Sequence, residues 1–254
     1  MLSILISTFN ERINNLEKVI KFQHPFVQYL IVHQNHSNSN IPKILNRKDI
    51  TIIESQTKGL SKSRNIALLN CKTEYALIAD DDIEYITEGL EKVIKIIQNE
   101  SPDFATFKIK TYEGQPEYKD YPKEKKCIDE NYEGWLSSIE ILLNIDKIKT
   151  KRIKFDQRFG LGTLLKKGEE NILIYDLLTN GLKGIYYPIY IVKHPFESSG
   201  KKATSERLHY FLKGCITQRT KTKTKDLFVN FSTFRKFKNM LFFHLGKLYI
   251  NVIK

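Results

Sequence analysis

The sequence lacks the long apolar runs, paired cysteines and internal repeats that define several classes of protein. No stretch approaches the roughly 20 uncharged apolar residues that span a bilayer, and no basic segment precedes the apolar N-terminus as in a signal peptide. Its three cysteines, Cys71, Cys127 and Cys215, are odd in number and share no metal-ligand spacing. We therefore expect reduced thiols in a cytoplasmic protein.

What the chain has in excess is positive charge. Its 254 residues are 41% hydrophobic and carry a formal charge of +12, which allows one large core with a short appendage. The charge is most one-sided from 201 to 254, where Glu206 and Asp226 are the only acidic residues. Anionic lipid, nucleic acid and phosphorylated ligands would all fit this surplus. Because the basic segment follows a more balanced globule, docking to a surface is favoured over a basic binding cleft.

The first hundred residues alternate between strand-like and helix-like patterns. Strands are expected at 2–7, 29–33, 51–54 and 75–79, and helices at 13–20, 60–69 and 87–100, the last with Thr87 as its N-cap. This alternation predicts an α/β fold with a mainly parallel central sheet flanked by helices. Ligands of such sheets bind at the carboxyl ends of the strands. The polar loops after the first two strands and the aspartates after the fourth all fall there.

The pattern changes after Pro102. We expect a strand at 104–111, an irregular loop at 113–126, an amphipathic helix at 135–143, a helix after Glu170 that ends at Asn180 and Gly181, and a last strand at 185–192. Beyond Gly200, apolar residues recur at helical spacing among many basic ones: Leu208, Phe211, Leu212, Phe234, Phe237, Leu241, Leu245 and Leu248. This predicts a basic helical extension, whose apolar stripe either lies on an anionic membrane or packs against the globule.

Three consecutive carboxylates, Asp80, Asp81 and Asp82, follow the fourth strand. Like charges this close raise one another's pKa unless a cation lies among them. A divalent ion with oxygen ligands would meet that need, and at the carboxyl end of a strand it would hold a diphosphate. A solvated acidic turn before the next helix is the simpler interpretation of these residues taken alone.

Five segments resemble, in order, the motifs of family 2 glycosyltransferases with a GT-A fold. They are Leu5–Glu11, Gly59–Leu68, Asp80–Asp82, Phe155–Gly160 with Gly168–Glu170, and His194-Pro195 with Ser198 and Ser199. The resemblance implies a Rossmann-like GT-A domain at 1–200, with a nucleotide-binding half at about 1–100 and an acceptor half at about 101–200, followed by the extension at 201–254. Two departures are His33-Gln34-Asn35, where the family often has an Asp that recognises uracil, and Glu169-Glu170 in place of Glu-Asp.

The resemblance implies roles for the residues at matching positions. It implies Glu170 as the catalytic base, with Glu169 as the alternative; Asp82, Asp80 and His194 as metal ligands; and Thr8, Asn10, Glu11, Gln34, Ser63, Arg64, Asp80 and Asp81 as contacts of a nucleotide-sugar. Simpler interpretations exist for each kind of residue: a strand-end turn, a helix-surface arginine, a loop histidine, and acidic residues attracted by a helix N-terminus.

The implied reaction moves a sugar from a nucleotide-sugar, most simply a UDP-sugar, to a hydroxyl group with the help of Mn²⁺ or Mg²⁺. One carboxylate base without a covalent nucleophile implies inversion of the anomeric configuration. No Gln-x-x-Arg-Trp motif is present, which implies a non-processive enzyme. A glycan or lipid-linked acceptor in cell-surface polysaccharide synthesis is expected. The basic extension would hold the enzyme on the inner face of the membrane, and no nucleic acid is expected as a partner.

Three alternatives stay open. A sugar-phosphate nucleotidyltransferase would need a basic triphosphate-binding loop near the N-terminus, and Thr8–Arg12 is a poor candidate. A non-enzymatic protein that binds nucleic acid or membranes explains the charge but gives the aspartates no role. It predicts salt-dependent binding of oligonucleotides without divalent metal. The third alternative is a catalytically silent scaffold of the same fold.

Overall fold

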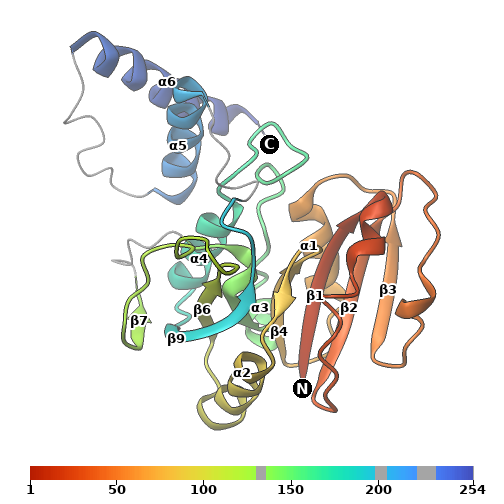
Figure 1. Cartoon of the computed structure of the whole chain (residues 1–254). Helices are drawn as coiled ribbons and strands as arrows, with labels where there is room; N and C mark the ends of the chain where they lie inside the picture. The colour runs from red at the N-terminus through yellow and green to blue at the C-terminus, as the bar shows by residue number, and fades with distance from the viewer. Residues whose placement is uncertain (130–135, 198–204, 222–232, 254) are drawn as a thin grey trace.

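The computed structural model describes residues 1–129, 136–197, 205–221 and 233–253. Within this part of the chain, a nine-stranded mixed sheet has the order β3-β2-β1-β4-β8-β6-β9-β5, with β7 paired to β9 (Figure 1). The strands are β1 (Leu2–Phe9), β2 (Val27–Gln34), β3 (Ile50–Ser55), β4 (Tyr75–Asp80), β5 (Glu84–Tyr85), β6 (Phe104–Lys110), β7 (Lys126–Ile128), β8 (Ile141–Asn144) and β9 (Gly184–Lys193). The helices are α1 (Leu60–Asn70), α2 (Thr87–Glu100), α3 (Ile145–Thr150), α4 (Glu169–Thr179), α5 (Glu206–Thr220) and α6 (Thr233–Val252), with 3-10 helices η1 (Asn10–Asn15), η2 (Lys43–Leu45) and η3 (Ser138–Glu140).

The first half of the sheet is parallel. β1 pairs in parallel with β2 and with β4, and β2 pairs in parallel with β3, so the carboxyl ends of these strands lie along one edge. Side chains of β1 alternate between two cores, with Ile4 and Ile6 on one face of the sheet and Leu5 on the other. The register sets Ser7 opposite Asp80. The predicted α/β fold, with a mainly parallel sheet flanked by helices, is confirmed.

The second half of the sheet is mixed, and one prediction for it is wrong. The residues expected to form an amphipathic helix at 135–143 form η3 and β8 instead, and Trp135 lies outside the described residues. β8 pairs antiparallel with both β4 and β6, and its residues Ile141, Leu142 and Leu143 are fully buried. A strand buried on both faces has an unbroken apolar run, which fits a helical pattern equally well.

Two helix predictions change in detail. Residues 13–20 bury their apolar side chains as predicted, but they form part of η1 and a run of turns rather than one α-helix. Thr87 is the first residue of α2, and Ile86 occupies the N-cap position instead. α4 ends as predicted, with Asn180 as its C-cap and Gly181 in the left-handed conformation at φ +80°.

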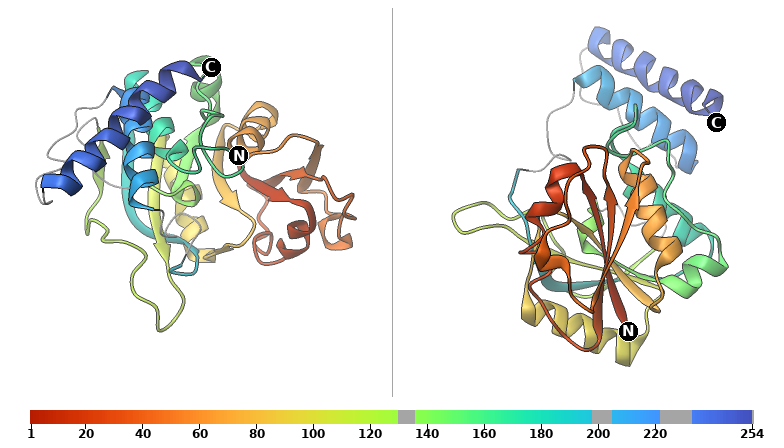
Figure 2. Two further views of the ribbon diagram at one scale, coloured as in Figure 1. Left: turned by 90° about the horizontal axis from the view of Figure 1, so that it is seen from above. Right: turned by 90° about the vertical axis from the view of Figure 1, so that its right-hand side faces the viewer.

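The predicted helical extension is present as α5 and α6. Figures 1 and 2 show both helices at one end of the molecule, with α5 between α6 and the sheet. The helices cross at two glycines, because Gly214 lies against the backbone carbonyl of Phe243 and Gly246 lies against that of Phe211. A side chain at either glycine would overlap the facing carbonyl, so the two backbones are in direct contact.

α5 is tied to the globule by buried charge pairs. Arg219, near the end of α5, donates to Asp156 (2.8 Å) and to both oxygens of Asp176 (2.7 and 3.0 Å). Arg158, which also binds Asp156, donates to backbone carbonyls near the end of α6 at 3.2 and 3.4 Å. The extension is therefore fixed to the domain through one of its faces.

The apolar stripe predicted for the extension divides between two environments. Its α5 members pack against the globule: Leu208, Phe211 and Leu212. Leu241, Leu245 and Leu248 of α6 are exposed by 49%, 42% and 65%, and the side chains of Phe234 and Phe237 lie outside the described part. Among the helices of the described residues, none has both the length and the apolarity to cross a bilayer.

Candidate active site

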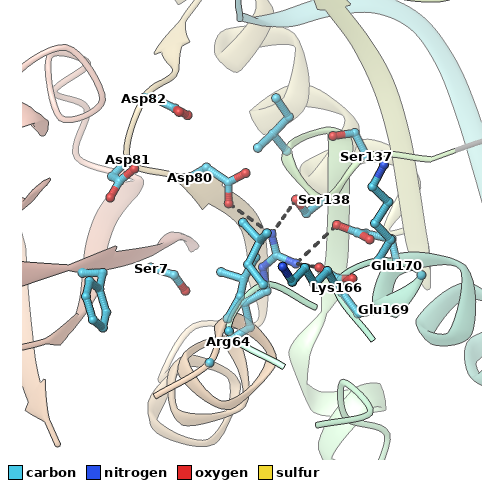
Figure 3. A pocket seen from close by; sticks show the side chains of 18 of the residues that line it. Ser7, Arg64, Asp80, Asp81, Asp82, Ser137, Ser138, Lys166, Glu169 and Glu170 are labelled. Atoms are coloured by element: carbon cyan, nitrogen blue, oxygen red, sulfur yellow. Dashed lines mark hydrogen bonds and ion pairs between the residues drawn. The ribbon is translucent and has the colours of Figure 1, made fainter. Parts of the chain in front are cut away.

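A pocket opens at the carboxyl ends of β1, β2 and β4 (Figure 3). Figure 3 shows the three aspartates on one side, and Lys166, Glu169 and Glu170 on the other, from the segment before α4 and its first turn. Residues of α5 also line the pocket. The predicted site residues that line this pocket are Thr8, Gln34, Arg64, Asp80, Asp81, Asp82, Glu169, Glu170 and His194. Segments distant in sequence thus meet where the parallel strands end.

Arg64 is buried between the two walls and connects them. It is 2% exposed, which excludes a helix-surface role. Its guanidinium donates to Asp80 (3.1 Å) and Ser138 (2.7 Å) on one side. On the other side it donates to Glu169 (3.3 Å) and Glu170 (3.4 Å). Burial alone would lower the pKa of Arg64, but the three carboxylates outweigh burial and raise it.

All three aspartates contact arginines, and two of them are held most closely. Asp81 is 4% exposed and accepts hydrogen bonds from Arg12 Nε (2.9 Å) and Thr8 Oγ1 (2.8 Å). Burial outweighs these bonds and raises the pKa of Asp81. Its neighbour Asp80 is paired with Arg64. These cations come from η1 and α1, two elements that lie far apart in the sequence.

The third aspartate, Asp82, faces His194. His194 Nε2 lies 3.6 Å from Asp82 Oδ1, and interaction with His194 is the main reason that the pKa of Asp82 is lowered. Burial would lower the pKa of His194, but Asp82 and the carbonyl of Pro195 raise it. Asp82 also accepts a hydrogen bond from Arg12 (3.2 Å), so each aspartate has an arginine partner, and repulsion among the three does not by itself require a bound ion.

Glu169 and Glu170 begin α4 after Gly168, which adopts the left-handed conformation at φ +104°. The Glu169 side chain is 5% exposed, and within the described residues its Oε2 has no hydrogen-bond partner. Burial, together with the charge of Glu170, raises the pKa of Glu169 far above its usual range. The Glu170 side chain is 18% exposed and lines the pocket, so it is the more accessible of the two.

Three residues predicted to contact a nucleotide-sugar do not line the pocket. Asn10, with φ +49°, accepts a hydrogen bond from the backbone N–H of His36 (2.7 Å). Glu11 is exposed on η1. Ser63 is buried between α1 and β1, where its hydroxyl donates to that of Ser7 (2.9 Å). Their contact with a donor stays a prediction.

Gln34 lies at the end of β2 and is 4% exposed. Its amide nitrogen donates to Thr57 Oγ1 (3.1 Å) and to the carbonyl of Gly59 (3.2 Å). Gly59 precedes α1 with φ +121°. These bonds fix the amide plane of Gln34 against the glycine loop, so one edge of the amide is used within the protein.

The residues predicted to bind a metal are only partly assembled. Asp82 and His194 lie together, whereas Asp80 is turned toward Arg64. In the part of the chain that the structure describes, no three His, Cys, Asp or Glu side chains converge as ligands of one ion. Carboxylate and imidazole nevertheless suit Mn²⁺, and the carboxylate oxygens also suit Mg²⁺.

Comparison with known proteins decides the family. The model of "Glycosyl transferase family 2" matches residues 3–166, which is more than half of the chain. The chain belongs to this family. The resemblance seen in the sequence is confirmed, and the protein is a glycosyltransferase rather than a nucleotidyltransferase. The match includes the aspartates but ends before Glu169, Glu170 and His194. Ser198 and Ser199, beside His194, lie outside the described residues.

This family 2 glycosyltransferase also resembles solved structures of TarS from S. aureus. TarS 1–349 in complex with UDP-GlcNAc has a TM-score of 0.66 and 16% identity, covering 98% of this chain and 72% of that one. For TarS 1–349 in complex with UDP, the TM-score is 0.63 and the identity 17%, covering 92% and 68%. A further structure of TarS, given without a residue range, has a TM-score of 0.64 and 17% identity. The match covers 98% of this chain but 43% of that one. At this identity the likeness establishes the GT-A fold. No curated protein matches the sequence.

Sequence reasoning missed several residues of the glycosyltransferase pocket. Arg12 pairs with Asp81 across 69 positions, and no local pattern signals such a pair. Ser138, a partner of Arg64, lay in the segment expected to be one long helix. The spacing of Ser137 and Glu140, which form a capping box, would have marked a new helix start there.

Proposed function

We propose that this family 2 glycosyltransferase moves a sugar from a UDP-sugar to a hydroxyl group of an acceptor, with inversion at the anomeric carbon. One observation carries the proposal: aspartates at the carboxyl ends of parallel strands share a pocket with Glu170, and Arg64 links the two walls. The TarS structures hold UDP-GlcNAc and UDP, and the common fold supports the same class of donor here.

Glu170 is the proposed general base. A base must reach the acceptor hydroxyl and must be free to accept its proton. Glu170 lines the pocket, whereas Glu169 is nearly buried and its raised pKa keeps it protonated at neutral pH. Glu169 then holds the Arg64 guanidinium in place through its hydrogen bond. Glu170 receives the acceptor proton.

The proposed transfer is a single displacement. As the acceptor O–H loses its proton to Glu170, its oxygen forms a bond to the anomeric carbon. The bond from that carbon to the diphosphate oxygen breaks on the opposite face, and the electron pair leaves with the nucleoside diphosphate. Nuclear magnetic resonance of the product would show the inverted anomer, and a product that retains the donor configuration would contradict this mechanism.

Mn²⁺ or Mg²⁺ is the proposed cofactor. Asp82 and His194 would hold it, with Asp80 assisting, and when bound it would neutralise charge on the leaving diphosphate. Asp81 would contribute little to the ion, because its oxygens are engaged by Arg12 and Thr8. Without a donor, the arginines Arg12 and Arg64 hold the three aspartates close together.

The proposed enzyme acts once per encounter on a glycan or lipid-linked acceptor in cell-surface polysaccharide synthesis. The exposed residues Leu241, Leu245 and Leu248 of α6 support a peripheral site on an anionic membrane. Changing all three to Gln should abolish binding to vesicles of phosphatidylcholine and phosphatidylserine. Unchanged sedimentation with those vesicles would contradict the membrane role. Substitution is preferable to deleting α6, because α6 packs on α5.

Release of UDP from a panel of UDP-sugars, beginning with UDP-GlcNAc, tests the function with and without Mn²⁺. Glu170→Gln should lower the rate about 10²–10⁴-fold, the usual contribution of a general base. Asp82→Ala should raise the Mn²⁺ concentration required for half-maximal rate by at least about tenfold.

Two exposed carboxylates provide matched controls, Glu91→Gln on α2 and Asp146→Ala on α3. Both should release UDP at the wild-type rate. If Glu170→Gln and Asp82→Ala also do so on a true donor and acceptor, the site is wrongly assigned.

A further inference from the structure

Part of the pocket wall that faces the aspartates is basic, beside the two glutamates of α4. Lys166 and Lys167 lie in the segment just before α4, and His209 and Lys213 project from α5, and all four line the pocket. Figure 3 shows Lys166 on the same side of the pocket as the two glutamates, away from the aspartates. α5 thus supplies part of the site, although it belongs to the C-terminal extension.

Two lysines of this basic wall are not neutralised in the way that the aspartates are. Among the described residues, neither Lys166 nor Lys213 forms an ion pair. Burial lowers the pKa of His209, and the nearby cations Lys213 and Lys167 lower it further. Burial also lowers the pKa of Lys213. Positive groups therefore crowd one another at the edge of a partly desolvated pocket, which is unfavourable unless an anion joins them.

The position of the wall indicates which substrate brings that anion. The donor nucleotide is proposed at the strand ends beside the aspartates, whereas the basic residues come from the segment that leads into Glu170 and from α5. A group that touches Lys166 lies beside the segment that carries the proposed base, because Lys166 precedes Glu170 by four residues. The group that occupies this position belongs to the acceptor, whose hydroxyl must reach the same base.

We infer that the acceptor of this enzyme is an anionic chain, whose phosphate or carboxylate groups bind Lys166, Lys167, His209 and Lys213 beside the reacting hydroxyl. The inference rests on the proposed function. Lysine ammonium groups bind phosphate and carboxylate as mobile point charges, which suits an extended, solvated polymer. Neighbouring charged groups of such a polymer would extend along α5.

Binding of three defined probes tests the inference at saturating UDP and Mn²⁺. The probes are a glycerol phosphate oligomer, tri-galacturonate and neutral maltotriose, which represent a phosphate chain, a carboxylate chain and an uncharged chain. We compare the full-length protein with the double variant Lys166→Ala/Lys213→Ala. The matched control is Lys92→Ala/Lys95→Ala, which removes two exposed lysines of α2 at the other end of the molecule (Figure 1).

At least one anionic probe should bind wild type and control equally and bind the Lys166→Ala/Lys213→Ala variant at least tenfold more weakly. Maltotriose should not bind, and circular dichroism should show that all variants are folded. The inference is overturned if neither anionic probe binds, if the double variant binds as tightly as wild type, or if maltotriose binds equally well. It is also overturned if a probe binds in the absence of UDP but not at saturating UDP, because the lysines would then hold the donor diphosphate.

The donor-only assay separates this inference from the proposed function. Hydrolysis of UDP-sugars in the absence of any acceptor reports the donor site and does not depend on Lys166 or Lys213. If wild type binds an anionic probe but releases UDP from no donor, the proposed function fails and the anion site stands. If UDP is released but no anionic probe binds, the proposed function stands and the anion site fails.

Discussion

The two walls of the pocket carry opposite charges and balance them in different ways. On the aspartate wall, Asp80 pairs with Arg64 of α1, and Asp81 and Asp82 pair with Arg12 of η1. On the basic wall, Lys166 and Lys213 have no ion-pair partner among the described residues. The first wall is complete within the chain, whereas the second is complete only when a ligand brings negative charge.

This difference predicts how each wall responds to mutation. Removing a cation from the balanced wall leaves a carboxylate without compensation, which is costly in a buried site. Removing a cation from the basic wall relieves repulsion and costs the free protein little. Stability measurements on the unliganded protein can therefore distinguish the two walls before any substrate is known.

Arg64→Ala should have the largest effect. It leaves Asp80, Glu169 and Glu170 around a buried space without a cation, and the loss of one partner from a buried charge network costs about 3–5 kcal/mol of unfolding free energy. Urea denaturation measures this loss. Lys62→Ala, an exposed position on the same helix, should change the midpoint little, and an equal loss in both variants would contradict the central place of Arg64.

Gly246→Ala should destabilise the contact between α6 and α5, the helix that carries His209 and Lys213 of the basic wall. The added methyl group would overlap the carbonyl of Phe211, so α5 and α6 must separate, and overpacking of this kind costs about 1–3 kcal/mol. Leu248→Ala, which trims an exposed side chain of the same helix, is the control. If Gly246→Ala unfolds at the wild-type urea concentration, the two helices do not cross as closely as described.

Glu169→Gln should change how stability depends on pH. The raised pKa of Glu169 means that the folded protein holds a proton that the unfolded chain releases above about pH 4.3. Wild-type stability should therefore fall relative to the variant as pH rises from about 4.3 to the folded pKa of about 8, by up to about 1.4 kcal/mol per pH unit, and the difference should vanish in acid. Denaturation at several pH values tests this, with Glu91→Gln as the reference for losing a surface carboxylate. A difference that grows toward acid would refute a buried, protonated Glu169.

Lys166→Gln should have the smallest effect on stability. It removes one of the crowded cations of the basic wall, so the unfolding free energy should change by less than about 0.5 kcal/mol. Thermal unfolding in low salt, where charge effects are largest, is the measurement. A loss comparable to that of Arg64→Ala would mean that Lys166 has a structural partner and that the walls are balanced alike.

The sequence predicted the aspartate wall better than the basic wall, for physical reasons. β4 and its aspartates are a local pattern, and the parallel register places Asp80 beside Ser7 once the alternation of strands and helices is recognised. Arg12 could not be assigned to Asp81, because side chains 69 positions apart leave no periodic signal. β8 was mistaken for a helix because complete burial removes the polar half of its pattern.

The basic wall was missed because α5 was taken for part of an appendage. Composition marked the C-terminal segment as basic and its spacing marked it as helical, but neither shows where a helix docks. The contacts that decide its place, from Arg219 to Asp156 and Asp176, are long-range ion pairs between residues that look like ordinary surface charges in the sequence. The fold family was readable from local motifs, whereas the second wall required tertiary structure.

The backbone contacts at Gly214 and Gly246 couple the positions of α5 and α6. Because backbone touches backbone there, no flexible side chain is available to absorb a push on the outer helix. Any displacement of α6 would therefore move α5 and Lys213 with it, so the outer helix fixes the position of a pocket residue that it does not itself supply.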